Sequence, residues 1–293
     1  MKYTIKSVNS VLNDTDNNAN AFEYCVNKAV PDGSNFYYAT LFETPENKIT
    51  LITFHAFLNE LYDVIYECKD PGVARIKLKW WQEEIERLFN HQARHPVTQQ
   101  LQQCIDVNEN LKLTFDNLID FFNHYIFIEQ TESLDTILAL YKPTSGEVWL
   151  QCHQQLSSRN NKLDVICELG ALIHYLDCIQ QPHTYINETR CIVPTNIIEN
   201  VDLQKLLINT DNRQQIQKET FSPLISELKT RLLEIQQELK ENRQDLIYDL
   251  IMSKLAIKTC NEILADDCQL LDRNISLTPI RKFWTAWLTR TFR

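Results

Sequence analysis

Apolar residues recur at intervals of three and four along most of the chain, the spacing that places them on one face of an α-helix. The clearest stretch spans residues 48–68, where Leu51, Phe54, Leu58, Leu61 and Ile65 follow this spacing. Further helical stretches are expected at 73–90, from Pro96 onward, and at 111–128, 132–156, 161–180, 222–240, 244–266 and 279–290. The pattern predicts an all-α protein.

Proline positions indicate where these helices end. Proline cannot donate the helical hydrogen bond and restricts the residue before it, so we expect each of the nine prolines at the edge of a helix. Between Pro182 and about Thr220 the periodicity weakens, which indicates a connecting region. Since no repeat or low-complexity linker divides the chain, we predict an N-terminal extension at 1–30 and one helical domain at 31–293.

Composition excludes several classes of function. With four glycines, the chain contains neither G-x-G-x-x-G nor a G-x-x-x-x-G-K-[ST] phosphate loop. The excess of 39 acidic over 29 basic residues gives a net charge of -10, which argues against a nucleic-acid partner. Nine cysteines without a C-x-x-C pair indicate reduced thiols, and we find neither a signal peptide nor a spanning apolar run. We therefore expect a cytoplasmic protein.

Three clusters of residues could carry chemistry, and the first is acidic. Glu60, Asp63 and Glu67 are spaced i, i+3, i+7 and so project from one side of the helix expected at 48–68. Carboxylates in that arrangement can hold Mg²⁺, which takes oxygen ligands. The alternative is a solvated polar face of an amphipathic helix.

The second cluster lies in the segment VARIKLKWWQEE and contains Lys77, Trp80, Trp81 and Glu84. Adjacent tryptophans cannot share one helix face, so at least one of them is expected to be partly exposed or to line a cavity. Packing in the core is the alternative.

The third cluster is the C-terminal segment 279–293. Aromatic and leucine side chains alternate there with arginines and a lysine, although the chain as a whole is acidic. A basic, aromatic-rich helix suits peripheral contact with a membrane surface, here the inner face of a membrane. The alternative is a closing helix docked on the core.

At these residues the sequence resembles the squalene/phytoene synthase family, over most of the chain. The segment AFLNELYDVIYE matches the family pattern A-F-x-R-E-x-D-D-x-x-D-E, and DPGVARIKLKWW matches D-P-x-V-A-R-x-K-L-x-W-W, with H-P-V following. Weaker similarity continues through Tyr141, Gly146, Trp149, Gly170 and Pro194 into the ending SLTPIRKFW.

The resemblance implies an all-α isoprenoid (terpenoid) synthase fold with a central cavity. Members of the family join two prenyl diphosphates head to head, with two D-x-x-x-D motifs that bind Mg²⁺ and the diphosphates. Metal and cations neutralise the leaving group there while aromatic walls shelter the carbocation. Carried over to this chain, the resemblance implies a substrate-binding set of Phe36, Tyr37, Tyr62, Tyr66, Lys77, Trp81, Gln181, Tyr185 and Arg190.

The chain departs from the family at the residues that matter for catalysis. The first pair of aspartates falls on Tyr62 and Tyr66, and an ungapped count from Gly170 places the second pair on Gln181 and Tyr185. The family arginine before the first motif is Asn59. Asp63 is one residue out of register, a rotation of about 100° on a helix, so it does not simply replace the missing pair. Tyrosine and amide groups are poor Mg²⁺ ligands.

Two principal interpretations of function follow. The first is a non-catalytic relative that binds a protein or an isoprenoid-like lipid. In this it looks similar to the family branch known as assembly factors for respiratory complex I, in which A-F-N-x-E-L replaces the acidic sequence.

The second interpretation is an active prenyltransferase for two prenyl diphosphates, with Mg²⁺ held by Glu60, Asp63, Glu67 and further acids. Asp116 and Asp120 form a D-x-x-x-D that matches neither motif position, and we interpret it as a solvated face. An unrelated helical binding module is a third interpretation.

Overall fold

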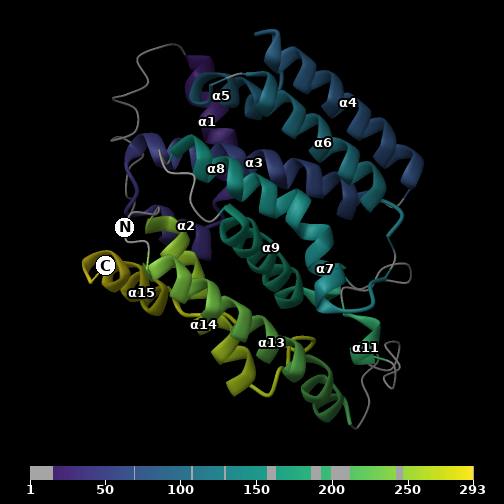
Figure 1. Ribbon diagram of the computed structural model, residues 1–293, viewed down its shortest axis with the longest axis vertical. Helices are drawn as coiled ribbons and strands as arrows, with labels where there is room; N and C mark the ends of the chain where they lie inside the picture. Colours follow the sequence, from purple (N-terminus) through teal and green to yellow (C-terminus); the bar gives the residue numbers. More distant parts are fainter. Residues whose placement is uncertain are drawn as a thin grey trace. The chain divides into compact units, whose positions relative to one another are not determined.

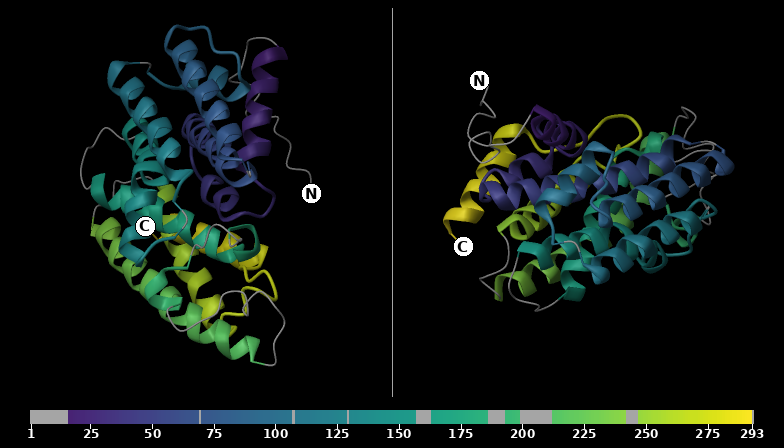
Figure 2. Two further views of the ribbon diagram at one scale, coloured as in Figure 1. Left: turned by 90° about the vertical axis from the view of Figure 1, so that its right-hand side faces the viewer. Right: turned by 90° about the horizontal axis from the view of Figure 1, so that it is seen from above.

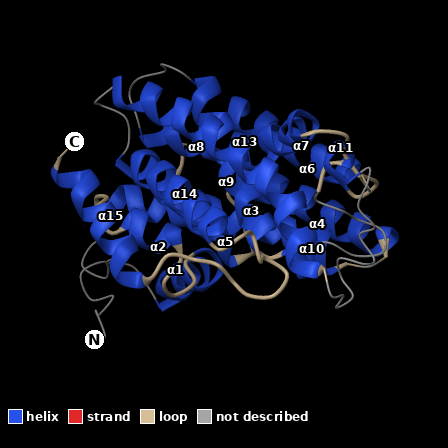
Figure 3. Ribbon diagram, turned by 90° about the horizontal axis from the view of Figure 1, so that it is seen from below, coloured by secondary structure: helices blue, strands red, loops and turns tan. Residues whose placement is uncertain are grey.

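The computed structural model describes residues 16–68, 70–106, 108–128, 130–156, 163–185, 193–198, 212–241 and 247–292. The side chains at 16–19, 184–185, 198 and 241 also fall outside this description. Within the described ranges every regular element is a helix and none is a strand (Figure 3). The all-α prediction is therefore confirmed. Among the helices described, none is both long and apolar enough to cross a membrane.

The chain divides into two compact units, Met1–Ile126 with Gln154–Ser158, and Phe127–His153 with Arg159–Arg293. The first unit contains α1 (Asp16–Ala29), α2 (Asn35–Thr40), α3 (Pro45–Glu67), α4 (Pro71–Phe89), α5 (Pro96–Cys104) and α6 (Glu109–Tyr125) (Figure 1). The second contains α7 (Leu134–Tyr141), the π-helix η2 (Lys142–Gly146), most of α8 (Glu147–Leu156), α9 (Leu163–Gln180), α10 (Pro182–Tyr185), α11 (Thr195–Ile198), α13 (Arg213–Glu241), α14 (Ile247–Ala265) and α15 (Pro279–Thr291).

In the first unit, helix α3 is the central element. It begins at Pro45 behind Thr44, whose hydroxyl accepts a hydrogen bond from the Asn47 amide, and its neighbours include α1, α4, α5 and α6. Helices α4 and α6 lie side by side (Figure 2). The rings of Phe57 and Phe115 meet with centroids 4.9 Å apart, and both side chains are buried. The apolar spacing read from residues 48–68 thus corresponds to a helix surrounded by other helices.

Helix α1 was not predicted from periodicity, because its segment contains no leucine, isoleucine or methionine and three of its apolar residues are alanines. Ala21, Phe22 and Cys25 are nevertheless buried, and the helix packs against α3 and α5. Its last turn is held by α3, since the Asn59 side-chain amide donates to the Lys28 carbonyl oxygen at 3.1 Å. The described part of the predicted extension therefore packs on the first unit as a helix.

In the second unit, two glycines set how closely helices approach. A Cβ atom on Gly170 of α9 would lie 2.7 Å from Trp149 Cβ and 2.9 Å from the Ser145 carbonyl oxygen. A Cβ on Gly146 would lie 2.5 Å from the Cys167 carbonyl oxygen. Only glycine fits at both positions, so α9 and η2 pack backbone to backbone.

The stretch expected as one helix at 132–156 is three elements, α7, η2 and α8. Pro143 lies in the π-helical turn, where its missing N–H is accommodated by the altered hydrogen-bond register.

The prediction for Pro223 was wrong. Helix α13 begins at Arg213, not at 222, and Pro223 lies inside it. Phe221, Leu224 and Leu228 around it are fully buried. Burial of these side chains offsets the lost hydrogen bond, which costs about 3 kcal/mol in a helix interior.

A buried polar cluster joins α8 to α14 in the second unit. The Trp149 indole N–H donates to Asp249 Oδ1 at 2.7 Å, and His153 Nδ1 lies 3.3 Å from Asp249 Oδ2. All three side chains are buried, so the carboxylate depends on these partners for its solvation. The eight cysteines among the described residues are all free thiols, as predicted.

Candidate functional site

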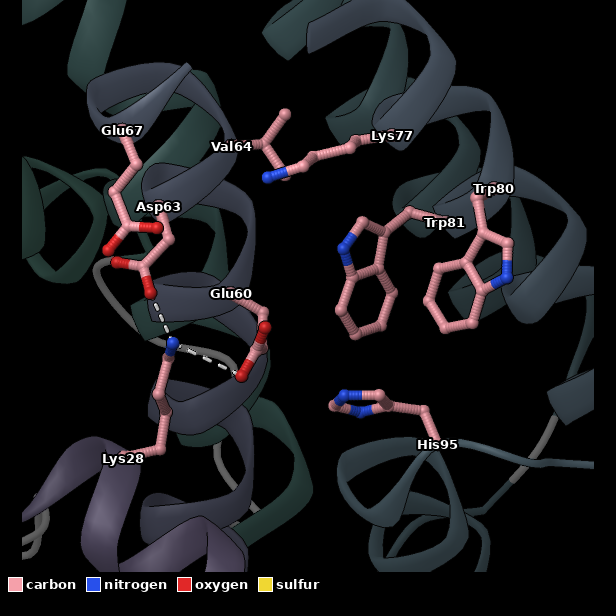
Figure 4. Close-up of a pocket in the computed structure, with 9 residues that line it drawn as sticks. All are labelled: Lys28, Glu60, Asp63, Val64, Glu67, Lys77, Trp80, Trp81 and His95. Atoms are coloured by element: carbon pink, nitrogen blue, oxygen red, sulfur yellow. Dashed lines mark hydrogen bonds and ion pairs between the residues drawn. The ribbon is translucent and has the colours of Figure 1, made fainter. Parts of the chain in front are cut away.

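A cleft of about 330 Å³ opens in the first unit, between helices α1, α3, α4 and the start of α5 (Figure 4). It brings together the first two clusters that the sequence analysis singled out. Its walls are formed by Lys28, Glu60, Asp63, Val64, Glu67, Lys77, Trp80, Trp81 and His95.

One wall of the cleft is an ion-pair cluster. The Lys28 ammonium lies 3.2 Å from Glu60 Oε1 and in closer contact with Asp63 Oδ2, as the dashed lines in Figure 4 show. The Tyr24 hydroxyl also donates to Glu60, at 2.6 Å. Burial opposes the charge on Lys28, but the two carboxylates outweigh burial and raise the pKa of the lysine. Both acids of this wall therefore already have a cation.

The rim of the cleft is more exposed. Glu67 lies in the last turn of α3, on the same face as Asp63, and is exposed to solvent. Lys77 extends from α4 toward Val64, on the other side of the opening (Figure 4). The three acids predicted at 60, 63 and 67 thus share one face of α3, where Lys28 pairs with two of them, and Lys77 faces them from α4.

The opposite wall is aromatic. Trp81 is 4% exposed and Trp80 is 42% exposed, so the two adjacent indoles lie in different environments, as predicted. Their centroids are 5.2 Å apart with the planes at 83°, and the His95 ring meets Trp81 edge-on at 4.9 Å. Such edge-to-face contacts favour a rigid arrangement.

Glu84 positions this aromatic wall from behind. Its buried carboxylate accepts hydrogen bonds from the amides of Arg94 and His95 at 2.6 and 2.8 Å, and from the Thr98 hydroxyl at 2.5 Å. Arg87 Nε donates to its second oxygen at 2.7 Å. Burial alone would raise the pKa of Glu84, but these hydrogen bonds outweigh it and lower the pKa. The carboxylate therefore fixes the turn from which His95 projects.

A different face of α3 carries the tyrosines that replace the family aspartates. Tyr62 is 4% exposed, stacks on Tyr66 with centroids 5.5 Å apart, and meets Phe122 of α6 edge-on at 5.0 Å. The Tyr66 hydroxyl lies 3.3 Å from the Tyr125 hydroxyl. Neither tyrosine lines the cleft, because a one-residue step turns a helical side chain by about 100°.

The remaining predicted residues lie elsewhere. Phe36 of α2 is buried with its ring 4.4 Å from His55, and Tyr37 meets Tyr38 edge-on at 5.1 Å. Gln181 is exposed directly after α9, and its backbone N–H donates to the Cys178 carbonyl oxygen. The Tyr185 side chain and the whole of Arg190 lie outside the described residues.

Two cleft residues were missed by sequence reasoning as functional candidates. Lys28 lies in the segment predicted as an extension, where periodicity gave no signal. The sequence analysis places His95 at a helix start and in the H-P-V match, but in no cluster. It does cap α5, since its ring nitrogen accepts from the Val97 amide at 3.3 Å. His95 comes fourteen residues after Trp81 and directly before Pro96, and neither fact indicates that the two rings would meet.

Comparisons with known proteins agree with this architecture. The family model for squalene/phytoene synthase matches residues 30–281. No match to the chain is found among curated protein sequences.

Three solved structures are similar in fold. A dehydrosqualene synthase in complex with ligand shares 12% identity with a TM-score of 0.77, covering 94% of this chain and 97% of that chain. Squalene synthase HpnC from Alicyclobacillus acidocaldarius shares 14% identity with a TM-score of 0.59, over 87% of this chain and 97% of its own. TcSQS in complex with the ligand E5700 shares 11% identity with a TM-score of 0.72, covering 94% of this chain and 86% of that chain.

The structural matches show the isoprenoid synthase fold, and the family model covers most of the chain. The chain therefore belongs to the squalene/phytoene synthase family.

Proposed function

We propose that the chain is a non-catalytic member of this family, a scaffold that binds an isoprenoid-like lipid or a protein partner. The observation that carries the proposal is the aromatic face of α3. Where the family motif requires carboxylates, Tyr62 and Tyr66 stack on each other and contact Phe122 and Tyr125 of α6. Neutral phenol groups that pack against a neighbouring helix do not supply the charge that binds Mg²⁺ and a diphosphate.

The acids nearest to this motif do not fit a metal site either. Lys28 makes ion pairs with both Glu60 and Asp63, so a dication would have to displace an ammonium group. Among the described residues, no group of three or more His, Cys, Asp or Glu side chains is arranged to hold a metal ion.

The altered motif has a structural role in this chain. Asn59, at the position of the family arginine, donates to the last turn of α1, and the adjacent Glu60 pairs with Lys28 of the same turn. Residues that would serve catalysis in the family thus fasten α1 to α3. This supports the likeness to the complex I assembly-factor branch, whose sequence also changes at this point.

A direct assay tests the proposal. Purified protein is incubated with farnesyl or geranylgeranyl diphosphate and Mg²⁺, and released pyrophosphate and hydrocarbon product are measured, with an active dehydrosqualene synthase as positive control. We expect neither pyrophosphate nor product. Turnover that disappears in Asp63→Asn would refute the proposal.

The runner-up function is an active prenyltransferase that condenses two prenyl diphosphates. One observation favours it, because Glu60, Asp63 and Glu67 do converge on a cleft that also holds Lys77 and Trp81. The prenyltransferase reaction requires these kinds of group: carboxylates to bind Mg²⁺, a cation to bind a diphosphate, and an aromatic wall. The Asp63→Asn variant in the assay above separates the two functions.

Ligand binding without turnover is measured separately. Farnesyl diphosphate is titrated into metal-free protein while tryptophan fluorescence is followed. Trp81→Phe is the test variant, and Trp287→Phe, an exposed residue of the second unit, is the comparison. If the lipid occupies the cleft, the Trp81→Phe substitution removes most of the signal change. An unchanged signal in that variant places the ligand elsewhere.

A further inference from the structure

Helix α15 is oriented with its apolar side outward. The residues that it buries are Lys282, Thr285, Ala286 and Thr289, which are small or polar. Ile280 is 70% exposed, Trp284 50% and Phe292 78%. A surface helix normally does the reverse and turns its apolar stripe to the core.

The exposed apolar residues form one continuous stripe. At about 100° per residue they fall on a single side of the helix. The stripe consists of Ile280, Phe283, Trp284, Trp287 and Leu288 on the helix and of Phe292 directly after it, all of which are exposed. The Trp284 and Trp287 rings meet edge-on at 5.2 Å, so the indoles are packed against each other. An exposed apolar patch of this kind marks an interaction surface.

Two arginines flank this stripe, and one lysine of α14 contacts α15, although the protein carries a net charge of -10. Arg281 and Arg290 lie at its two margins on α15, and both are exposed, with Arg281 paired to Glu262 of α14 at 2.6 Å. Beside α15, which lies along α14 (Figure 2), the Lys258 ammonium donates to the Thr285 hydroxyl at 2.7 Å.

More lysines gather next to Lys258. Lys254 lies one turn before Lys258 on α14, and burial together with the charges of Lys240 and Lys258 lowers its pKa. Like charges of this kind are unfavourable in an isolated protein, and an anionic partner relieves them.

We propose that the α15 stripe docks on the surface of an anionic lipid bilayer. Tryptophan and phenylalanine insert at the level of the headgroups, and the flanking lysines and arginines pair with lipid phosphates. A second copy of the chain fits less well, because pairing two such stripes would bring two sets of Lys254, Lys258 and Arg290 together. The proposal is independent of whether the protein has prenyltransferase activity.

Co-sedimentation with vesicles tests the proposal on the full chain. Vesicles of phosphatidylcholine with one third phosphatidylglycerol are compared with phosphatidylcholine alone. The test variant is Trp284→Ala/Trp287→Ala, and the matched control removes two exposed apolar side chains of the first unit, Ile76→Ala/Leu113→Ala. Circular dichroism establishes that both double variants are folded.

We expect binding to the anionic vesicles that weakens with salt and exceeds binding to phosphatidylcholine. The double tryptophan variant should bind about tenfold or more weakly, since burying one large apolar side chain alone changes an equilibrium by that factor. Lys254→Gln and Lys258→Gln should each weaken binding to anionic vesicles by about fivefold. The control variant should bind as the native chain does.

Two results would overturn the proposal. One is vesicle binding that is absent, or that is equal in the native chain and the double tryptophan variant. The other is a dimer of the native chain in light scattering that becomes a monomer in the double tryptophan variant, because a second copy then covers the stripe.

Discussion

Helices α3 and α15 have the same kind of apolar spacing and opposite environments. In α3, residues such as Leu51, Phe57 and Leu61 are fully buried, and the charged groups line an open cleft. In α15 the aromatic side chains are exposed, while Lys282 and two threonines are buried. The comparison shows that periodicity identifies the two sides of a helix but does not say which side the rest of the protein covers.

The largest effect is expected from truncating the buried side of α3. Phe57→Ala should lower the free energy of unfolding by about 3–5 kcal/mol, because the ring is fully buried between Trp81 and Phe115 and its removal leaves a cavity. Urea denaturation followed by circular dichroism measures this loss. A loss below about 1 kcal/mol would contradict the packing described for this unit.

The second-largest effect is expected at Glu84, whose carboxylate fixes the turn from which His95 projects. Glu84→Gln should destabilise the protein by about 2–4 kcal/mol, since an amide cannot accept from Arg94, His95, Thr98 and Arg87 as the carboxylate does. Denaturation at pH 7 tests this value. Glu83→Gln, on the exposed side of the same helix, is the control and should change stability by less than about 0.5 kcal/mol.

The same residue makes stability depend on pH. The pKa of Glu84 is lower in the folded protein than the 4.5 of an unperturbed glutamate. Its stabilising contribution is therefore complete above that value and is lost as the pH falls through it toward the folded-state pKa. Stability curves of the native chain and Glu84→Gln should converge in acid. Parallel curves down to pH 3 would show that Glu84 is not the group responsible.

A smaller effect is expected where α1 is fastened to α3. Asn59→Ala removes the hydrogen bond to the Lys28 carbonyl oxygen and should cost about 1 kcal/mol. Hydrogen exchange should show the loss as faster exchange in α1, with α6 unchanged. Uniformly faster exchange in both helices would mean that Asn59 acts on the whole unit instead.

Most helices of the first unit could be predicted from the sequence, because apolar spacing and proline positions both follow from helix geometry. Apolar residues at steps of three and four, with Pro45, Pro71 and Pro96 at helix starts, located α3, α4 and α5 within a few residues. Helix α1 and the interior position of Pro223 were missed, because tertiary packing stabilises both against weak local signals. Helical spacing also grouped Glu60, Asp63 and Glu67 correctly. No local pattern could place Lys28 opposite them, since that contact spans more than thirty residues.

The smallest effect, and the one that most sharpens the comparison of α3 with α15, is expected at Trp284. Trp284→Ala removes a larger side chain than Phe57→Ala, yet the free energy of unfolding in solution should change by less than about 1 kcal/mol. Half of the indole is exposed, and its ring contacts are with Phe283 and Trp287, which are themselves exposed. Urea denaturation without lipid measures this value alongside the α3 variant. If Trp284→Ala costs as much as a core truncation, the stripe is covered in solution and its apolar residues belong to a core. A change within the expected limit agrees with a stripe that is uncovered in solution, as the proposed contact with a lipid surface requires.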